Sequence, residues 1–221
     1  MSTAQADYYR LRTEWLRFKS QLFDALTGLP ALPAVIEDVR RLVAARGGVE
    51  VLYLDLGRSG LHEMTHGWAA YDEAVQEFAQ LLLSSRESGE LGAQDVVCLL
   101  SVRSDRFIAF LAEEDPRHPD VGGRRERLLA WLRKRLESAN LGSLLRNCGF
   151  SAGHAWVGAD PMVRCERSIQ QAVADAILMS LAEREGTEAA RRRELARLIQ
   201  ESGIRTVFHP IVRLADRSVI G

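Results

Sequence analysis

The sequence predicts an α/β domain in which helices are layered on a mixed sheet. Segments with apolar residues at helical spacing alternate with short runs rich in β-branched and aromatic residues, which are typical of strands. Two of these runs lie close together in the middle of the chain around a tight connection, which predicts a hairpin. A hairpin among alternating helices and strands favours a mixed sheet over an all-parallel one.

Composition excludes several classes of protein. The chain has 221 residues, which is enough for one sizeable core, and its 47% hydrophobic and 27% charged content is ordinary for a globular domain. The formal net charge of -1 gives no global field that would attract nucleic acid or an anionic membrane, so we expect neither as a partner. No apolar run approaches the roughly 18 residues that span a bilayer.

The cysteines and the N-terminus indicate a reduced, cytoplasmic protein. Cys98, Cys148 and Cys165 are odd in number and form no CxxC pair, which argues against a disulfide framework and a zinc site. The first residues lack the basic and then apolar layout of a secretion signal.

The chain begins with a predicted helix that carries a stripe of large apolar side chains. They are spaced alternately three and four residues apart, at Tyr8, Leu11, Trp15, Phe18 and Leu22. This spacing is typical of a short coiled-coil seam. We expect it to form a homodimer through the N-terminal helix, and the alternative is that the stripe packs on its own domain.

The other elements follow in chain order. Helices are expected along the apolar positions from Val35 to Val43, over 72–85, and along the leucines from Leu128 to Leu136. A further helix is expected to begin at a cap, Asp160, with Pro161 next. A charged break at 183–188 is expected to separate it from a last helix over "EAARRRELARLIQESG". Strands are expected over 49–56, 95–102, 106–114 and 146–158, with two more in the tail.

Several motifs appear in the order of one known family. "DALTGLP" resembles the D-x-LTGLPNR motif, and "YLDL" followed by Gly67 and Asp72 matches the D-x-D-x-F-K-x-x-N-D-x-x-G-H-x-x-G-D stretch in register. "RSDRF" at 103–107 lies where the signature hairpin is expected, and "GFSAGHAWV" and "AVADAILMS" resemble later motifs. The chain therefore resembles the GGDEF domain of diguanylate cyclases over about residues 22–182.

The tail carries a second resemblance, since "VFHPIVRLADRSVIG" is similar to the first strands of an EAL domain. Together the resemblances imply an N-terminal signalling helix over 1–22, a degenerate GGDEF domain over 23–185, and a linker helix with the first EAL strands over 186–221. The implied fold is a mixed-sheet, palm-type nucleotidyl-cyclase domain surrounded by helices, with a C-terminal helix-strand appendix.

The family resemblance also implies a site. Family enzymes join two GTP molecules into cyclic di-GMP with divalent cations that neutralise triphosphate charge. By position, Asp55, the Leu56 carbonyl and Asp105 would hold Mg²⁺ together with GTP, and Asp72 and Glu63 would contact guanine.

Several substitutions at these positions predict that cyclase activity is lost. Gly57 replaces the next metal carboxylate, and Arg103 and Ser104 replace two glycines that let backbone approach the nucleotide. Arg106 replaces an acid and reverses a charge near the cations, and no RxxD product-inhibition motif precedes the hairpin. The vestigial nucleotide-binding set is then Asp55, Glu63, Asp72, Arg103, Ser104, Asp105 and Arg106.

Three functions stay open on these residues. The first is an inactive regulatory module that binds GTP and controls an EAL domain in cis or in trans. The others are an interaction scaffold that binds no nucleotide and a cyclase with an atypical site. Simpler structural roles are also open: Asp72 as a helix cap, Asp55 and Asp105 as turn caps, and His154 as a structural residue. His62, Glu63 and His66 fit HExxH on paper, but the family register explains that stretch better.

Overall fold

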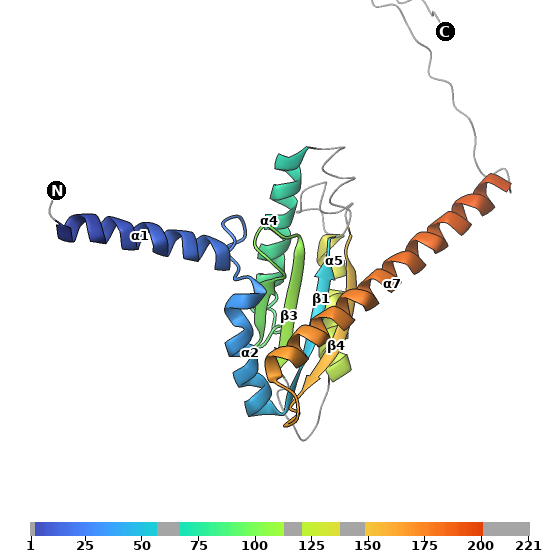
Figure 1. Cartoon of the computed structure of the whole chain (residues 1–221). Helices are drawn as coiled ribbons and strands as arrows, with labels where there is room; N and C mark the ends of the chain where they lie inside the picture. Colours follow the sequence, from blue (N-terminus) through green and yellow to red (C-terminus); the bar gives the residue numbers. More distant parts are fainter. Residues whose placement is uncertain (1–2, 57–66, 113–120, 138–148, 201–221) are drawn as a thin grey trace, which may run out of the picture. The chain divides into compact units, whose positions relative to one another are not determined.

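The computed structural model describes residues 3–56, 67–112, 121–137 and 149–200 (Figure 1). The chain separates into two compact units, Met1–Glu183 and Arg184–Gly221. The first unit holds the sheet, and the described part of the second is helical. The two strands predicted in the tail lie outside the described residues.

Four described strands form one sheet in the order β2-β3-β1-β4. They are β1 (Gly48–Asp55), β2 (Val96–Leu99), β3 (Arg106–Ala112) and β4 (Ser151–Gly158). The three pairings are antiparallel, and in the described residues the parallel component is limited to one bridge between Ala31 and Leu99. The predicted α/β class and hairpin are confirmed, and β2 is shorter than expected.

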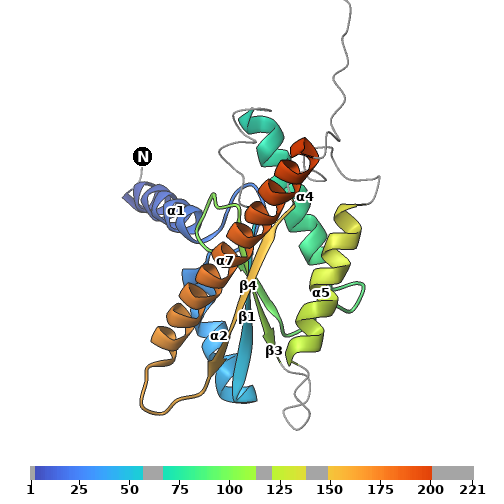
Figure 2. The ribbon, with the colours of Figure 1, turned by 90° about the vertical axis from the view of Figure 1, so that its right-hand side faces the viewer.

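Helices cover both faces of the sheet (Figures 1 and 2). On one face, Leu52, Leu54 and Phe107 pack with α4 (Trp68–Ser84) and α5 (Val121–Leu136). On the other face, Val51 and Tyr53 pack with α2 (Leu32–Arg46) and the first part of α7 (Cys165–Gln200). The alternation of side chains along β1 therefore sends neighbouring residues to different cores.

Helix α4 begins four residues earlier than the sequence pattern predicted. Gly67, with φ 85°, precedes the first turn, and the good helix formers Ala69 and Ala70 follow Trp68. Asp72 consequently lies inside the helix, and its predicted role as an N-terminal cap is wrong. Asp72 instead lines the pocket described below.

Helix α7 begins later than the sequence predicted and continues through the predicted break. Asp160 accepts the backbone N–H of Met162 at 2.8 Å and closes a turn, while the helix starts later, at Cys165. The predicted break at 183–188 is wrong, since the helix continues to Gln200. Glutamate and arginine, which dominate this stretch, are good helix formers, so charge density alone does not interrupt a helix.

Gly153 explains how α7 lies close to β4. A Cβ at this position would meet the backbone oxygen of Ala176 at 1.9 Å and the backbone nitrogen of Ser180 at 2.6 Å. Only glycine therefore permits this spacing between helix and strand. The contact fixes the first part of α7 on the sheet face that also carries Tyr53.

The predicted N-terminal helix is present as α1 (Thr3–Leu22). Its apolar stripe is exposed in the described part of the chain, with Trp15 at 61% and Tyr8 at 60%. None of the described helices combines the length and apolar character that crossing a membrane requires.

Candidate functional site

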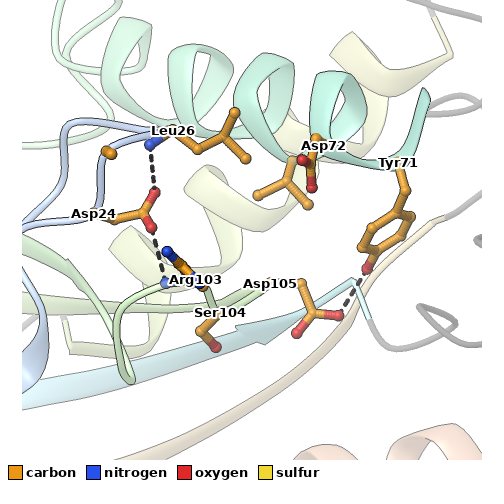
Figure 3. A pocket seen from close by; sticks show the side chains of 9 residues that line it. Asp24, Leu26, Tyr71, Asp72, Arg103, Ser104 and Asp105 are labelled. Carbon is orange, nitrogen blue, oxygen red and sulfur yellow. Dashed lines mark hydrogen bonds between the residues drawn. The ribbon is translucent and has the colours of Figure 1, made fainter. Parts of the chain in front are cut away.

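An open pocket of about 550 Å³ lies where the β2–β3 hairpin meets helix α4 (Figure 3). Its lining residues are Asp24, Ala25, Leu26, Tyr71, Asp72, Val75, Arg103, Ser104 and Asp105. The fold thus brings together four members of the predicted nucleotide-binding set, namely Asp72, Arg103, Ser104 and Asp105. A pocket of this size is within the range of small-molecule sites.

Asp24 links two walls of this pocket. Its carboxylate is 4% exposed and accepts the N–H groups of Leu26 at 3.1 Å and Thr27 at 2.8 Å, and the Thr27 hydroxyl at 2.9 Å. The other oxygen accepts the backbone N–H of Arg103 at 2.8 Å (Figure 3). The "DALTGLP" loop and the hairpin are therefore held together by one buried carboxylate, a role that the sequence analysis missed.

The hairpin keeps the backbone of a glycine turn with an arginine side chain. Arg103 has φ 58°, and among the described residues it is the one non-glycine with positive φ. Side chains beyond Cα disfavour this conformation, which glycine adopts freely. The hydrogen bond that its backbone N–H donates to Asp24 holds the residue there.

Helix α4 contributes two polar side chains to the opposite wall. The hydroxyl of Tyr71 donates to a carboxylate oxygen of Asp105 at 2.7 Å. Asp72, the next residue, is half-buried and lines the pocket. The helical pattern alone did not single out Tyr71, because a tyrosine on a buried stripe is usually core.

Asp55 and Arg106 lie beside this pocket, at the end of the β1–β3 pair. They face each other in the β1–β3 register, and neither lines the pocket. Asp55 is 5% exposed and follows Tyr53 on the α2–α7 side of the sheet. The Tyr53 hydroxyl donates to Asp55, and burial, with the charge of Asp55, raises the pKa of that tyrosine. The predicted site is consequently divided between the pocket lining and the strand end beside it.

The positions of these residues show whether they could hold the expected Mg²⁺ ions together. No three His, Cys, Asp or Glu residues of the described ranges lie together as a possible metal site. Of the expected ligands, Asp105 receives a hydrogen bond from Tyr71, Asp55 lies outside the pocket lining, and Leu56 is buried. This donor set does not fit a pair of cations that shares one triphosphate. Glu63, Gly57 and the two histidines of the HExxH-like stretch lie outside the described residues.

Asp95, shortly before the hairpin, has a structural role. Its carboxylate accepts the guanidinium of Arg124 at 2.6 Å and the N–H groups of Gly92 at 2.7 Å and Ala112 at 2.8 Å. Arg125, the next residue of α5, pairs with Glu50. Arg124 and Arg125 at the start of α5 therefore stabilise the fold.

No protein-family model matches the sequence, and no curated protein matches it either. Solved structures do match. A sensory box/GGDEF family protein from Caulobacter crescentus has a TM-score of 0.54 and 19% identity, over 75% of this chain and 99% of that one. The coiled coil and GGDEF domain of DgcB, also from C. crescentus and in complex with c-di-GMP, has a TM-score of 0.54 and 16% identity, over 83% and 91%.

A third match is diguanylate cyclase SiaD from Pseudomonas aeruginosa in complex with its activator SiaC, with a TM-score of 0.53 and 16% identity, over 83% of this chain and 66% of that one. At these identities the likeness shows the fold alone. The chain has the fold of GGDEF domains, as the motifs predicted.

Proposed function

We propose that this chain is a regulatory module of cyclic di-GMP signalling that makes no cyclic di-GMP itself and controls an EAL domain, either attached to it or in a partner protein. One observation carries the proposal: Asp105 lines the pocket, while Asp55 lies outside its lining, beside Arg106. A cyclase of this kind needs its carboxylates together, because they hold cations against one triphosphate. The GGDEF fold and the c-di-GMP complex of DgcB support the signalling context.

A direct assay tests the missing activity. Purified protein incubated with GTP and Mg²⁺ or Mn²⁺ is expected to form no cyclic di-GMP by chromatography. The matched control is Asp55→Ala, which removes the one carboxylate at the first metal position. Product above a blank that disappears in Asp55→Ala would instead establish a cyclase with an atypical site.

The same module is proposed to bind a guanine nucleotide, GTP in the first instance, and not cyclic di-GMP. The pocket gathers Asp72, Arg103 and Asp105, whereas the sequence has no inhibitory RxxD motif before the hairpin. Calorimetry with GTP and cyclic di-GMP, with and without Mg²⁺, checks the ranking. Tight binding of cyclic di-GMP alone would reverse it, and binding of neither would favour an interaction scaffold.

Self-association through α1 is the third part of the proposal. Tyr8, Leu11, Trp15 and Phe18 each expose more than half of their surface in the described part of the chain. A helix of this length with an unburied apolar stripe is marginal alone, so a second copy would stabilise it. The coiled coil in the DgcB structure supports this idea.

Light scattering tests the dimer. The full chain is expected to dimerise, and a version that begins near Leu22 is expected to be monomeric. If both are monomers at high concentration, α1 does not relay a signal by pairing.

The link to EAL rests on the tail motif "VFHPIVRLADRSVIG", which lies outside the described residues. Hydrolysis of cyclic di-GMP by an EAL domain is expected to change when this chain is fused before it or added to it. An unchanged rate in both arrangements would remove regulation of EAL from the proposal.

A further inference from the structure

The charges around the pocket are unequal. Its nine described lining residues include three aspartates and a single cation, Arg103. A site for a cation-bound triphosphate would need these aspartates free to bind metal, and a site for a bare triphosphate would need several cations. The described lining is less suited to either triphosphate form than to a nucleotide with a single phosphate.

The aspartates are not equally available to a ligand. Asp24 already accepts four hydrogen bonds within the protein and is buried, so it offers a ligand little. Asp105 has one oxygen bound by the Tyr71 hydroxyl, and Asp72 is half-buried on the pocket wall. A ligand would therefore meet acceptors from Asp72 and Asp105, which suit the N–H groups of a neutral base.

The apolar part of the lining suits a planar base as well. Leu26 and Val75 contribute aliphatic surface to the lining. Small-molecule pockets combine such surface with a few placed polar groups that fix orientation. The base portion of a nucleotide is accommodated without a metal ion.

The single cation occupies a position that is unfavourable for its backbone. Arg103 adopts φ 58° although glycine would adopt it more readily, and its guanidinium forms no ion pair with a described residue. Backbone strain held in place by a buried carboxylate is frequent at functional sites. The side chain is thus available at the pocket for one anionic group.

From these observations we propose that the pocket binds a guanine nucleoside monophosphate without a divalent cation, and that Arg103 holds its phosphate. The inference rests on the proposed function, because that function supplies the guanine nucleotide. One planar guanidinium can bind one phosphate with two hydrogen bonds. Each further phosphate adds negative charge near Asp72 and Asp105 with no second cation in the lining to offset it.

Calorimetry of the full chain tests this proposal with guanosine, GMP, GDP and GTP, each in EDTA and in Mg²⁺. GMP is expected to bind equally in both buffers and at least about tenfold more tightly than GTP in EDTA. AMP serves as the base control. Stronger GTP than GMP binding that depends on Mg²⁺ would overturn the inference and leave the proposed function standing. Binding of no guanine compound would overturn both this inference and the proposed GTP binding, and would favour an interaction scaffold.

Variants of the two hairpin arginines test which side chain binds the phosphate. Arg103→Gly removes the guanidinium while suiting the positive φ, and it is expected to weaken GMP binding by about 10- to 100-fold and leave guanosine binding unchanged. Arg103→Asn, which also tolerates this backbone, should behave in the same way. Arg106→Ala removes an equally exposed arginine of the same hairpin that lies off the pocket. If it weakens GMP binding as much as Arg103→Gly, the phosphate is not held in the pocket and the inference fails.

Discussion

The two ends of the β1–β3 pair carry the same kinds of charged residues in different arrangements. At the end near Ala112, arginines of α5 meet carboxylates of the sheet region in nearly buried ion pairs, Arg124 with Asp95 and Arg125 with Glu50. Buried charges are costly unless they are paired, and each of these two carboxylates has an arginine partner. We call this set the network end.

At the hairpin end, Arg103 and Arg106 form no ion pair with another described residue. Arg103 and Arg106 are exposed, while Asp105 and Asp55 receive hydrogen bonds from Tyr71 and Tyr53. Residue type alone therefore does not tell a charged side chain that stabilises the fold from one that is available to bind a ligand. The two kinds of charge differ in whether the oppositely charged partner lies within the fold. At the hairpin end, the guanidinium groups of Arg103 and Arg106 are exposed to solvent.

The largest expected difference between the two ends comes from removing one carboxylate at each. Asp95→Ala leaves Arg124 buried without its ion pair and two N–H groups without their acceptor, so we expect a loss of about 3–5 kcal/mol. The matched variant Asp105→Ala removes one hydrogen bond from Tyr71 at a half-buried position and should cost about 1 kcal/mol. Urea unfolding measures both. Equal costs would abolish the contrast between the ends.

Asp55 tests whether the hairpin end hides a structural pair of its own. Asp55→Ala should cost about 1–3 kcal/mol, because the buried Tyr53 hydroxyl loses its acceptor. The double variant Asp55→Ala with Tyr53→Phe should recover part of this loss, since both polar partners are then absent. A cost as large as that of Asp95→Ala, with no recovery, would show that Asp55 and Arg106 form a second network.

Arg103→Gly is expected to change stability in the opposite direction. Relief of the positive φ should stabilise the protein by roughly 1 kcal/mol, since no ion pair is lost in the described structure. The same change at Arg124 should destabilise it by several times that amount, because Asp95 would be left buried and unpaired. Thermal unfolding of the two variants is the measurement. A destabilised Arg103→Gly would mean that its side chain supports the hairpin.

Much of the fold could be predicted from the sequence, because apolar periodicity reports directly on buried faces. It located every helix and strand discussed above, and it failed at boundaries. The start of α4 depended on the backbone at Gly67, and the continuity of α7 depended on helix propensity within a charged stretch. Neither is visible as a change in apolar spacing.

The site was harder to predict, since its geometry is non-local. The bond from Arg103 to Asp24 joins residues 79 positions apart, and sequence offers no signal for such a contact. Strand alternation could show that Tyr53 and Asp55 share a face, but not that Asp55 lies outside the pocket lining. The motif register therefore could not show which of these residues line the pocket and which lie beside it.

The smallest expected effect is a pH response of His154, which lies midway along β4 and feels the charge of Arg125 from the network end. Burial, followed by the charge of Arg125, lowers the pKa of His154 on β4 below its ordinary value of 6.5. The unfolded chain then binds the proton more readily, so stability is complete above about pH 6.5 and falls as pH drops from there toward the lowered pKa. Solvent screens this half-buried group, so the change should stay below about 0.5 kcal/mol.

His154→Gln isolates this response. The variant should lose less stability than the parent between pH 7 and 5.5 in urea titrations, and an NMR titration of the parent should place the His154 pKa below 6.5. Acidic groups contribute to the slope of both proteins and cancel in the difference. A His154 pKa above 6.5 would contradict this prediction. It would mean that a nearby carboxylate has a larger effect on His154 than Arg125, which is paired with Glu50.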